Sequence, residues 1–224
     1  MVIEWGTPLM NDPLYDSYGD PMTDAFTWQL GVFADEDGNQ VDPTSIDPRD
    51  WKSYWVVFDQ ADFDTSSMFS PAVLGEATIL DDGTSSSSYA ESGFVFSGMD
   101  AYVWAFNTQD YVYGLEWLIY RSEDWVFPED PVYPPVPEDE WLNVDDLVQS
   151  DVPLWGNQNG VVDADSGNLS YASNPQLYHP LDNDLLQSYT IIPEPGTYAA
   201  GALLLGIGGF QWWMRRRKKI AATV

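Results

Sequence analysis

Residues 93–120, GFVFSGMDAYVWAFNTQDYVYGLEWLIY, decide the fold class. Within them, residues 93–97, 100–106 and 114–120 are rich in the aromatic and β-branched side chains that favour strands. Glycine or Asn/Asp turn residues separate the three segments, and such turn signals between strand-like segments are typical of hairpins. The pattern therefore predicts an antiparallel meander of three strands.

Strand-like composition recurs on both sides of this stretch. Further strands are predicted at residues 26–33, at residues 51–58 after a helical turn, at residues 75–80, and as edge strands at 160–162 and 189–192. Loops are predicted at residues 1–25 (with one short strand), 35–50 and 127–140, and a short helix at residues 138–149. Many short strands around an aromatic core predict an all-β domain, a sandwich or jelly-roll-like fold with long acidic and proline-rich loops.

The composition indicates a folded and strongly acidic protein. The 224 residues are 44% hydrophobic and 15% aromatic, which suffices for one globular domain with a core. All 36 Asp and Glu residues, but only three of the eight Lys and Arg residues, precede residue 196, so that segment carries −33 and the remainder +5. Such a body repels phosphate backbones, which excludes nucleic acid as a partner. It suits a protein that stays soluble outside a cell, or one that binds divalent cations.

Cysteine and histidine, two residue types that commonly carry catalysis, are absent or rare in this chain, whereas carboxylates are abundant. Cysteine is absent, which excludes disulfides, cysteine-based zinc sites and thiol catalysis. The single histidine, His179, lies in a polar loop without a G-x-S-x-G motif, so a Ser-His-Asp triad is not expected. Glu116 stands beside Trp117, as acids do in many sugar sites, but we interpret it as an outward-facing strand residue. We therefore expect a protein that is not an enzyme.

Two loops have the composition of a calcium site. Their oxygen-bearing residues are Asp35, Asp37, Asn39 and Asp42 in the first loop, and Asn157, Asn159, Asp163 and Asp165 in the second. Alternating Asp and Asn oxygens around a glycine are how hard cations are wrapped, although neither loop has the terminal glutamate of an EF-hand. Turns are also rich in Asp, Asn and Gly for backbone reasons alone. Calcium is thus the one cofactor that the sequence suggests, and both interpretations stay open.

The C-terminal region has the pattern of a membrane-spanning helix. Residues 197–214 contain no charge, and as a helix they would span about 27 Å, which just matches a hydrocarbon core. Trp212 and Trp213 fall where an interfacial aromatic belt belongs. The five cations that follow are Arg215, Arg216, Arg217, Lys218 and Lys219. The positive-inside rule then predicts a cytoplasmic C-terminus and an acidic body outside.

A Pro-Glu-Pro motif directly precedes this helix. The order of Pro193, Glu194 and Pro195, an apolar helix and a basic stop resembles the PEP-CTERM sorting signal of Gram-negative bacteria. The resemblance covers residues 192–219 and no part of the body. It implies that an exosortase, a membrane-embedded cysteine transpeptidase, recognises the tail and cleaves it near the motif. It further implies a precursor tethered to the inner membrane and a mature protein in the cell envelope, at the surface or in the extracellular matrix.

These patterns predict four regions. They are an acidic, aromatic-rich extracytoplasmic β domain at residues 1–190, a sorting segment at 191–196, a transmembrane helix at 197–214 and a basic cytoplasmic stop at 215–224. Export requires a signal peptide, and residues 1–6 have neither the basic n-region nor the apolar h-region of one. We therefore expect that a signal peptide was left off this sequence or that the gene start lies further upstream, and that the Sec translocon is then a partner.

Two functions are open for the body. The first is a non-enzymatic structural or binding role in an exported protein. The alternative is a carbohydrate-binding or carbohydrate-acting extracellular domain, whose partner would be an extracellular polysaccharide. A concave face with exposed aromatic side chains and paired carboxylates favours the alternative, whereas a closed core with featureless acidic faces favours the first role.

Overall fold

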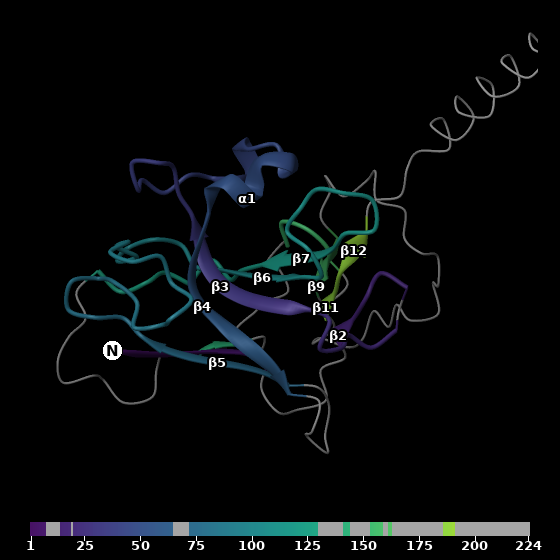
Figure 1. Cartoon of the computed structure of the whole chain (residues 1–224), viewed down its shortest axis with the longest axis horizontal. Coiled ribbons are helices and arrows are strands. Elements are labelled where there is room, and N and C mark those ends of the chain that lie inside the picture. The colour runs from purple at the N-terminus through teal and green to yellow at the C-terminus, as the bar shows by residue number, and fades with distance from the viewer. Residues whose placement is uncertain are drawn as a thin grey trace, which may run out of the picture. The chain divides into compact units, whose positions relative to one another are not determined.

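Strands dominate the part of the chain that can be described. The computed structural model describes residues 1–7, 14–18, 20–64, 72–129, 141–143, 153–158, 161–162 and 186–190. The chain divides into two compact units, Met1–Ile191 and Ile192–Val224, and all the described residues belong to the first. The prediction of a mostly β fold is confirmed (Figure 1).

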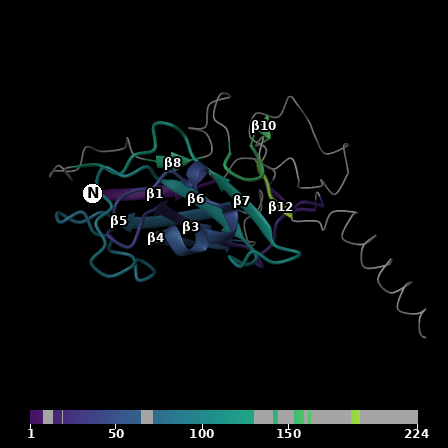
Figure 2. The same cartoon turned by 90° about the horizontal axis from the view of Figure 1, so that it is seen from above.

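The described strands form one large sheet and one small sheet. The large sheet has the order β12-β7-β6-β3-β4-β5-β1-β8 and the small sheet β10-β9-β11-β2 (Figures 1 and 2). The strands of the large sheet are β1 (Val2–Gly6), β3 (Thr27–Phe33), β4 (Trp55–Asp64), β5 (Ala72–Thr78), β6 (Tyr102–Phe106), β7 (Glu116–Tyr120), β8 (Trp141–Asn143) and β12 (Tyr189–Thr190). Those of the small sheet are β2 (Leu14–Tyr15), β9 (Asn157–Gln158), β10 (Val161–Val162) and β11 (Leu186–Gln187). Pairing is antiparallel, except for the parallel pairs β1–β8 and β2–β11.

The centre of the large sheet is buried on both faces. Every residue of β6 and β7 is buried, and neighbours along each strand alternate between two separate hydrophobic clusters. In β6, Val103 and Ala105 join one cluster, while Tyr102, Trp104 and Phe106 join the other. A strand covered on both faces has apolar residues without a gap, which explains why YVWAF and WLIY are continuous hydrophobic runs.

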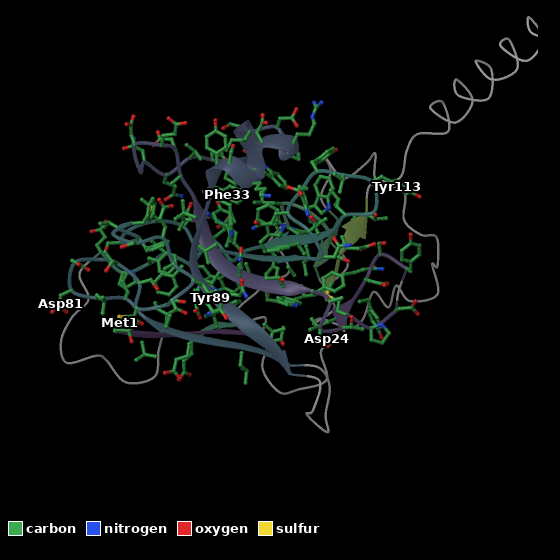
Figure 3. All side chains as sticks on the ribbon, viewed as in Figure 1. Met1, Asp24, Phe33, Asp81, Tyr89 and Tyr113 are labelled. Carbon is green, nitrogen blue, oxygen red and sulfur yellow. The ribbon has the colours of Figure 1, made fainter. Side chains whose placement is uncertain are left out.

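One of these clusters is almost entirely aromatic. Most of its rings meet edge to face, at centroid distances such as 5.1 Å for Trp104 and Trp117 and 5.4 Å for Trp55 and Trp104, and Trp51 stacks on Trp117. The short helix α1 (Trp51–Tyr54) covers this face with Trp51, whose Nε1 donates to the Pro43 carbonyl at 3.0 Å. Phe33, labelled in Figure 3, lies inside this cluster. Aromatic pairs of this geometry stabilise a core beyond their buried area.

Most of the predicted strands exist, and two elements were predicted wrongly. The strands at residues 26–33, 75–80, 100–106 and 114–120 are confirmed within a few residues as β3, β5, β6 and β7, and β4 follows the helical turn α1 as expected. Residues 93–97 form a loop instead of a strand, because Phe96 turns into the core against Phe58 and Phe127. The helix predicted at residues 138–149 is contradicted by β8, which pairs with β1.

The predicted transmembrane helix is not among the described residues. Residues 197–214 lie beyond them, as do the basic residues at 215–219 and the motif at 193–195. Within the described ranges, no helix is both long and apolar enough to cross a bilayer.

Candidate functional site

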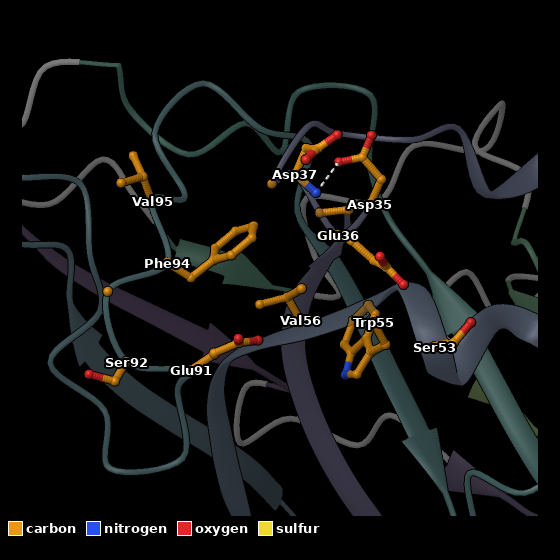
Figure 4. Close-up of a pocket in the computed structure, with 13 residues that line it drawn as sticks. Asp35, Glu36, Asp37, Ser53, Trp55, Val56, Glu91, Ser92, Phe94 and Val95 are labelled. Atoms are coloured by element: carbon orange, nitrogen blue, oxygen red, sulfur yellow. Dashed lines mark hydrogen bonds between the residues drawn. The ribbon is translucent and has the colours of Figure 1, made fainter.

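A hollow of 490 Å³ opens beside the start of β4 (Figure 4). It is lined by the loop at residues 34–38, by Ser53, Trp55 and Val56, and by the loop at residues 91–95. Four carboxylates contribute to this lining, namely Asp35, Glu36, Asp37 and Glu91. The hollow therefore combines an anionic rim with apolar surface from Phe94, Val56 and Val95.

Asp35 organises the loop on one side of the hollow. Its Oδ1 accepts from the backbone amides of Asp37 at 3.0 Å and Asn39 at 2.8 Å, and Asn39 Nδ2 donates to both carboxylate oxygens. These hydrogen bonds, above all the one from the Asn39 backbone, lower the pKa of Asp35 from its ordinary value. Asp35 thus holds the turn in shape, and Glu36, Asp37 and Glu91 supply further negative charge.

The aromatic lining is mostly turned toward the protein. Trp55 is only 9% exposed, and its Nε1 donates to Gln29 Oε1 at 2.9 Å. Only a small part of the indole is therefore left to line the hollow. Phe94 is half-buried on the opposite loop. An anionic rim over partly apolar walls can accept a cationic ligand, or a polyhydroxylated ligand whose apolar face meets a ring.

The predicted calcium ligands of the first loop are divided between two turns. Asp35, Asp37 and Asn39 share the turn at the hollow. Asp42 instead caps a 3-10 helix (Pro43–Ser45), accepting from Thr44 N and Thr44 Oγ1, and the Thr44 hydroxyl is the main cause of its lowered pKa. In the described parts of the chain, no three His, Cys, Asp or Glu residues are grouped as metal ligands.

The second predicted calcium loop falls mostly outside the described residues. Asn157 lies in β9, whereas Asn159, Asp163 and Asp165 are beyond the described ranges. Calcium binding stays a prediction for both loops. A calorimetric titration of the chain with calcium that gives neither heat nor a thermal shift would contradict it.

Glu116 is a buried carboxylate, and our interpretation of it as an outward-facing residue was wrong. Only 7% of the residue is exposed. Its Oε1 accepts from Ser17 Oγ at 2.5 Å, and its Oε2 accepts from Ser17 N at 3.0 Å and from Ser188 Oγ at 2.6 Å. Desolvation by burial raises the pKa of Glu116, and the hydrogen bonds from Ser17 and Ser188 offset part of that rise.

Sequence reasoning missed the serine partners of Glu116, although one signal was present. Glu116 is the only charged residue in the strand EWLIY, on a face whose next member, Leu118, belongs to the core. A charged side chain in such a position is expected to be paired or hydrogen-bonded. Ser17 and Ser188 have no local pattern that identifies them, since they lie 99 and 72 residues away along the chain.

Other predicted functional residues are not described. The motif Pro193, Glu194 and Pro195 and the basic residues 215–219 fall outside the described ranges, as does His179, for which no catalytic role is expected. Comparison of the chain with models of protein families, with curated proteins and with solved structures found no match.

Proposed function

We propose that this chain is the precursor of an exported bacterial protein, delivered to the cell envelope, surface or extracellular matrix by a C-terminal sorting tail. The observation that carries the proposal is the order of the tail: Pro193-Glu194-Pro195, then 18 uncharged residues at 197–214, then five consecutive cations. In this proposal the helix is a transient anchor, and an exosortase removes it by cutting near the motif. The prolines keep the cleavage site extended and outside the helix.

Two features of the body support this role. The first compact unit ends at Ile191, so the motif lies in the second unit, directly after the body in sequence. The body has no Lys or Arg between Arg121 and the five cations at 215–219, and this asymmetry favours a body outside and a tail that stops at the cytoplasmic face. We propose that the two sheets form a sandwich-like domain with a structural or binding role and no catalytic activity.

Deletion of the motif tests the proposal. Without residues 193–195, the chain is expected to stay at full length in the membrane fraction of a bacterium that contains an exosortase, whereas the wild-type chain is shortened and leaves that fraction. Deletion of residues 222–224, beyond the basic cluster, is the length-matched control and should behave like the wild type. If the motif deletion and the wild-type chain fractionate identically, the sorting proposal is wrong.

A second candidate function is carbohydrate binding at the hollow in Figure 4. The observation that favours it is the grouping of Glu91 and Glu36 with the half-buried ring of Phe94 around one 490 Å³ space. Carboxylates that accept from sugar hydroxyls and a ring that covers an apolar sugar face are the elements of such a site.

Calorimetry with polysaccharide from the producing cells tests this candidate. Phe94→Ala is expected to weaken binding several-fold, on the order of the 0.5–1.5 kcal/mol that an aromatic contact contributes. Tyr113→Ala is the control, because Tyr113 is 70% exposed, does not line the hollow and points outward in Figure 3. Equal affinity of the Phe94 variant and the wild-type chain would exclude the hollow as the sugar site.

A further inference from the structure

The last described residues of the body, 186–190, bridge parts of the chain that are far apart in sequence; we call them the closing segment. Backbone pairing joins the segment to β2, β7 and β9. The Ser188 amide donates to the Tyr15 carbonyl at 2.9 Å, and Trp155 Nε1 donates to the Tyr189 carbonyl at 3.2 Å. The segment thus connects β2 of the small sheet to β7 near the edge of the large sheet.

Glu116 is the polar centre of this arrangement. One of its carboxylate oxygens accepts from both Ser188 Oγ and the Ser17 amide, and the other accepts from Ser17 Oγ. Ser17 is 2% exposed and Ser188 is fully buried, so water does not compete for these hydrogen bonds while the segment is docked. Glu116, on β7, therefore holds both the closing segment, through Ser188, and the loop that contains Ser17.

The same carboxylate also favours release of the closing segment. None of the three ion pairs in the described ranges involves Glu116, so no cation among the described residues offsets the charge of its buried carboxylate. A buried charge without a partner of opposite sign is costly, and release of the segment would return it to water. Within the segment, β12 is a two-residue strand at the edge of the large sheet, and such strands open more easily than central ones. Hydrogen bonds to two serines hold the segment closed, while hydration of Glu116 favours its opening.

The position of the closing segment links it to the tail. Ser188, Tyr189 and Thr190 are at most 2% exposed, and Pro193 is only three residues beyond Thr190. Three residues of extended chain span at most about 11 Å, so Pro193 lies within about 11 Å of the buried Thr190. An enzyme that binds several residues on each side of Pro193 would need residues 188–190, and these are inaccessible while they remain docked.

We propose that the closing segment is a latch: its release from Glu116 and β7 frees the chain directly before the Pro-Glu-Pro motif and limits the rate of tail cleavage. This inference rests on the sorting function proposed above. It assigns Ser17, Glu116 and Ser188 a regulatory role, because the strength of their hydrogen bonds sets how often the segment is released.

Hydrogen exchange of the full-length chain in detergent micelles tests whether the segment opens on its own. Ser188→Ala removes a hydrogen bond to a charged group and should speed exchange of residues 186–190 roughly tenfold or more. Glu116→Gln keeps a carbonyl oxygen that accepts from Ser188 Oγ and the Ser17 amide, and its side-chain amide can donate to Ser17 Oγ. Because the variant also removes the buried charge, it should slow exchange of residues 186–190. Residues 27–33 in β3 are the internal reference, and the exposed changes Ser92→Ala and Glu123→Gln are matched controls.

Tail cleavage of the same variants in an exosortase-containing bacterium tests the consequence. Cleavage that is fastest for Ser188→Ala and slowest for Glu116→Gln supports the latch. Equal cleavage rates contradict it and leave the sorting proposal standing. Exchange at residues 186–190 that changes only in step with residues 27–33 also contradicts it, because the segment then opens only when the whole domain unfolds. A wild-type chain that is never shortened overturns the sorting proposal and, with it, the latch.

Discussion

At the scale of single residues, Glu116 connects the ends of the body to its centre. It accepts hydrogen bonds from residues 99 positions before it and 72 positions after it. Its location in a strand was predictable from EWLIY, but its burial was not, because burial depends on Ser17 and Ser188 arriving from distant parts of the chain. The same limit applies to Phe96, whose place in the core is decided by contacts with Phe58 and Phe127. Residue types indicate chemistry, and only the tertiary contacts decide whether that chemistry is exposed.

The raised pKa of Glu116 predicts a pH-dependent difference in stability. A carboxyl group whose pKa is higher in the folded state binds more protons there, so its contribution to stability falls as pH rises through the raised pKa. Asp16, the charged neighbour that acts on Glu116, raises this pKa further. Glu116→Gln is therefore expected to be more stable than the wild-type chain at neutral pH, and the gap should close as pH falls toward the ordinary glutamate pKa.

Urea unfolding of both chains between pH 4 and pH 8 measures this difference. Both chains lose stability in acid through carboxylates with a lowered pKa, such as Asp47 with a pKa of about 2. Subtracting the free energy of unfolding of the wild-type chain from that of the variant cancels this shared loss. Glu123→Gln, at an exposed position, is the control and should show no such trend. A gap that is constant with pH, or that widens in acid, would contradict the assigned burial of Glu116.

At the scale of elements, the longer apolar runs identified strands reliably, whereas the short run FVF at residues 94–96 did not. The runs YVWAF and WLIY belong to strands covered on both faces, so their identity follows from composition alone. GFVFS has a similar composition but forms a loop, since a lone inward phenylalanine and flanking glycines at positive φ, Gly93 and Gly98, suit a turn as well as a strand. Of the small sheet, only β10 was predicted, as the edge strand at 160–162, and the pairing of its two-residue strands was beyond prediction because they are stable only within the surrounding tertiary contacts.

A matched pair of glycines tests the packing of the closing segment on the large sheet. Gly156 and Gly114 both have positive φ, at 103° and 83°. A Cβ on Gly156 would lie 2.7 Å from the Gln187 carbonyl oxygen, whereas one on Gly114 meets nothing within 4 Å. Gly114→Ala should cost about 1–2 kcal/mol from backbone strain alone. Gly156→Ala should cost about 1–3 kcal/mol more through overpacking.

Thermal and urea unfolding of the two variants give the comparison. The excess destabilisation of Gly156→Ala should be accompanied by faster hydrogen exchange at residues 186–190. Equal stability of the two variants would mean that the closing segment does not pack against Gly156 as described.

At the scale of the whole molecule, charge is the dominant feature. The segment before residue 196 carries −33, a sum that already includes Arg49, Lys52 and Arg121, the three cations of the ion pairs among its described residues. Two of these pairs, Arg49–Asp47 and Lys52–Asp110, are largely exposed and contribute little. Self-repulsion should therefore destabilise the folded body at low ionic strength, where charges interact over about 30 Å, and much less at physiological salt, where the range is about 8 Å.

The melting temperature is accordingly expected to rise with sodium chloride. For a domain of this size, each kcal/mol of relieved repulsion raises it by about 2–4 °C, and scanning calorimetry across a salt series from low to physiological ionic strength measures the rise. Sucrose solutions of matched osmolality are the control for effects unrelated to charge. A melting temperature that is flat or falls with salt would show that the net charge does not limit stability.

The mass of the mature protein tests the central claim most directly. Intact mass spectrometry of the chain, recovered outside the inner membrane of an exosortase-containing bacterium, should show a product that ends close to residues 193–195 and lacks residues 197–219. A recovered chain that still contains residues 197–219, with or without the Pro-Glu-Pro motif, would contradict the assignment of the tail as a cleaved sorting signal.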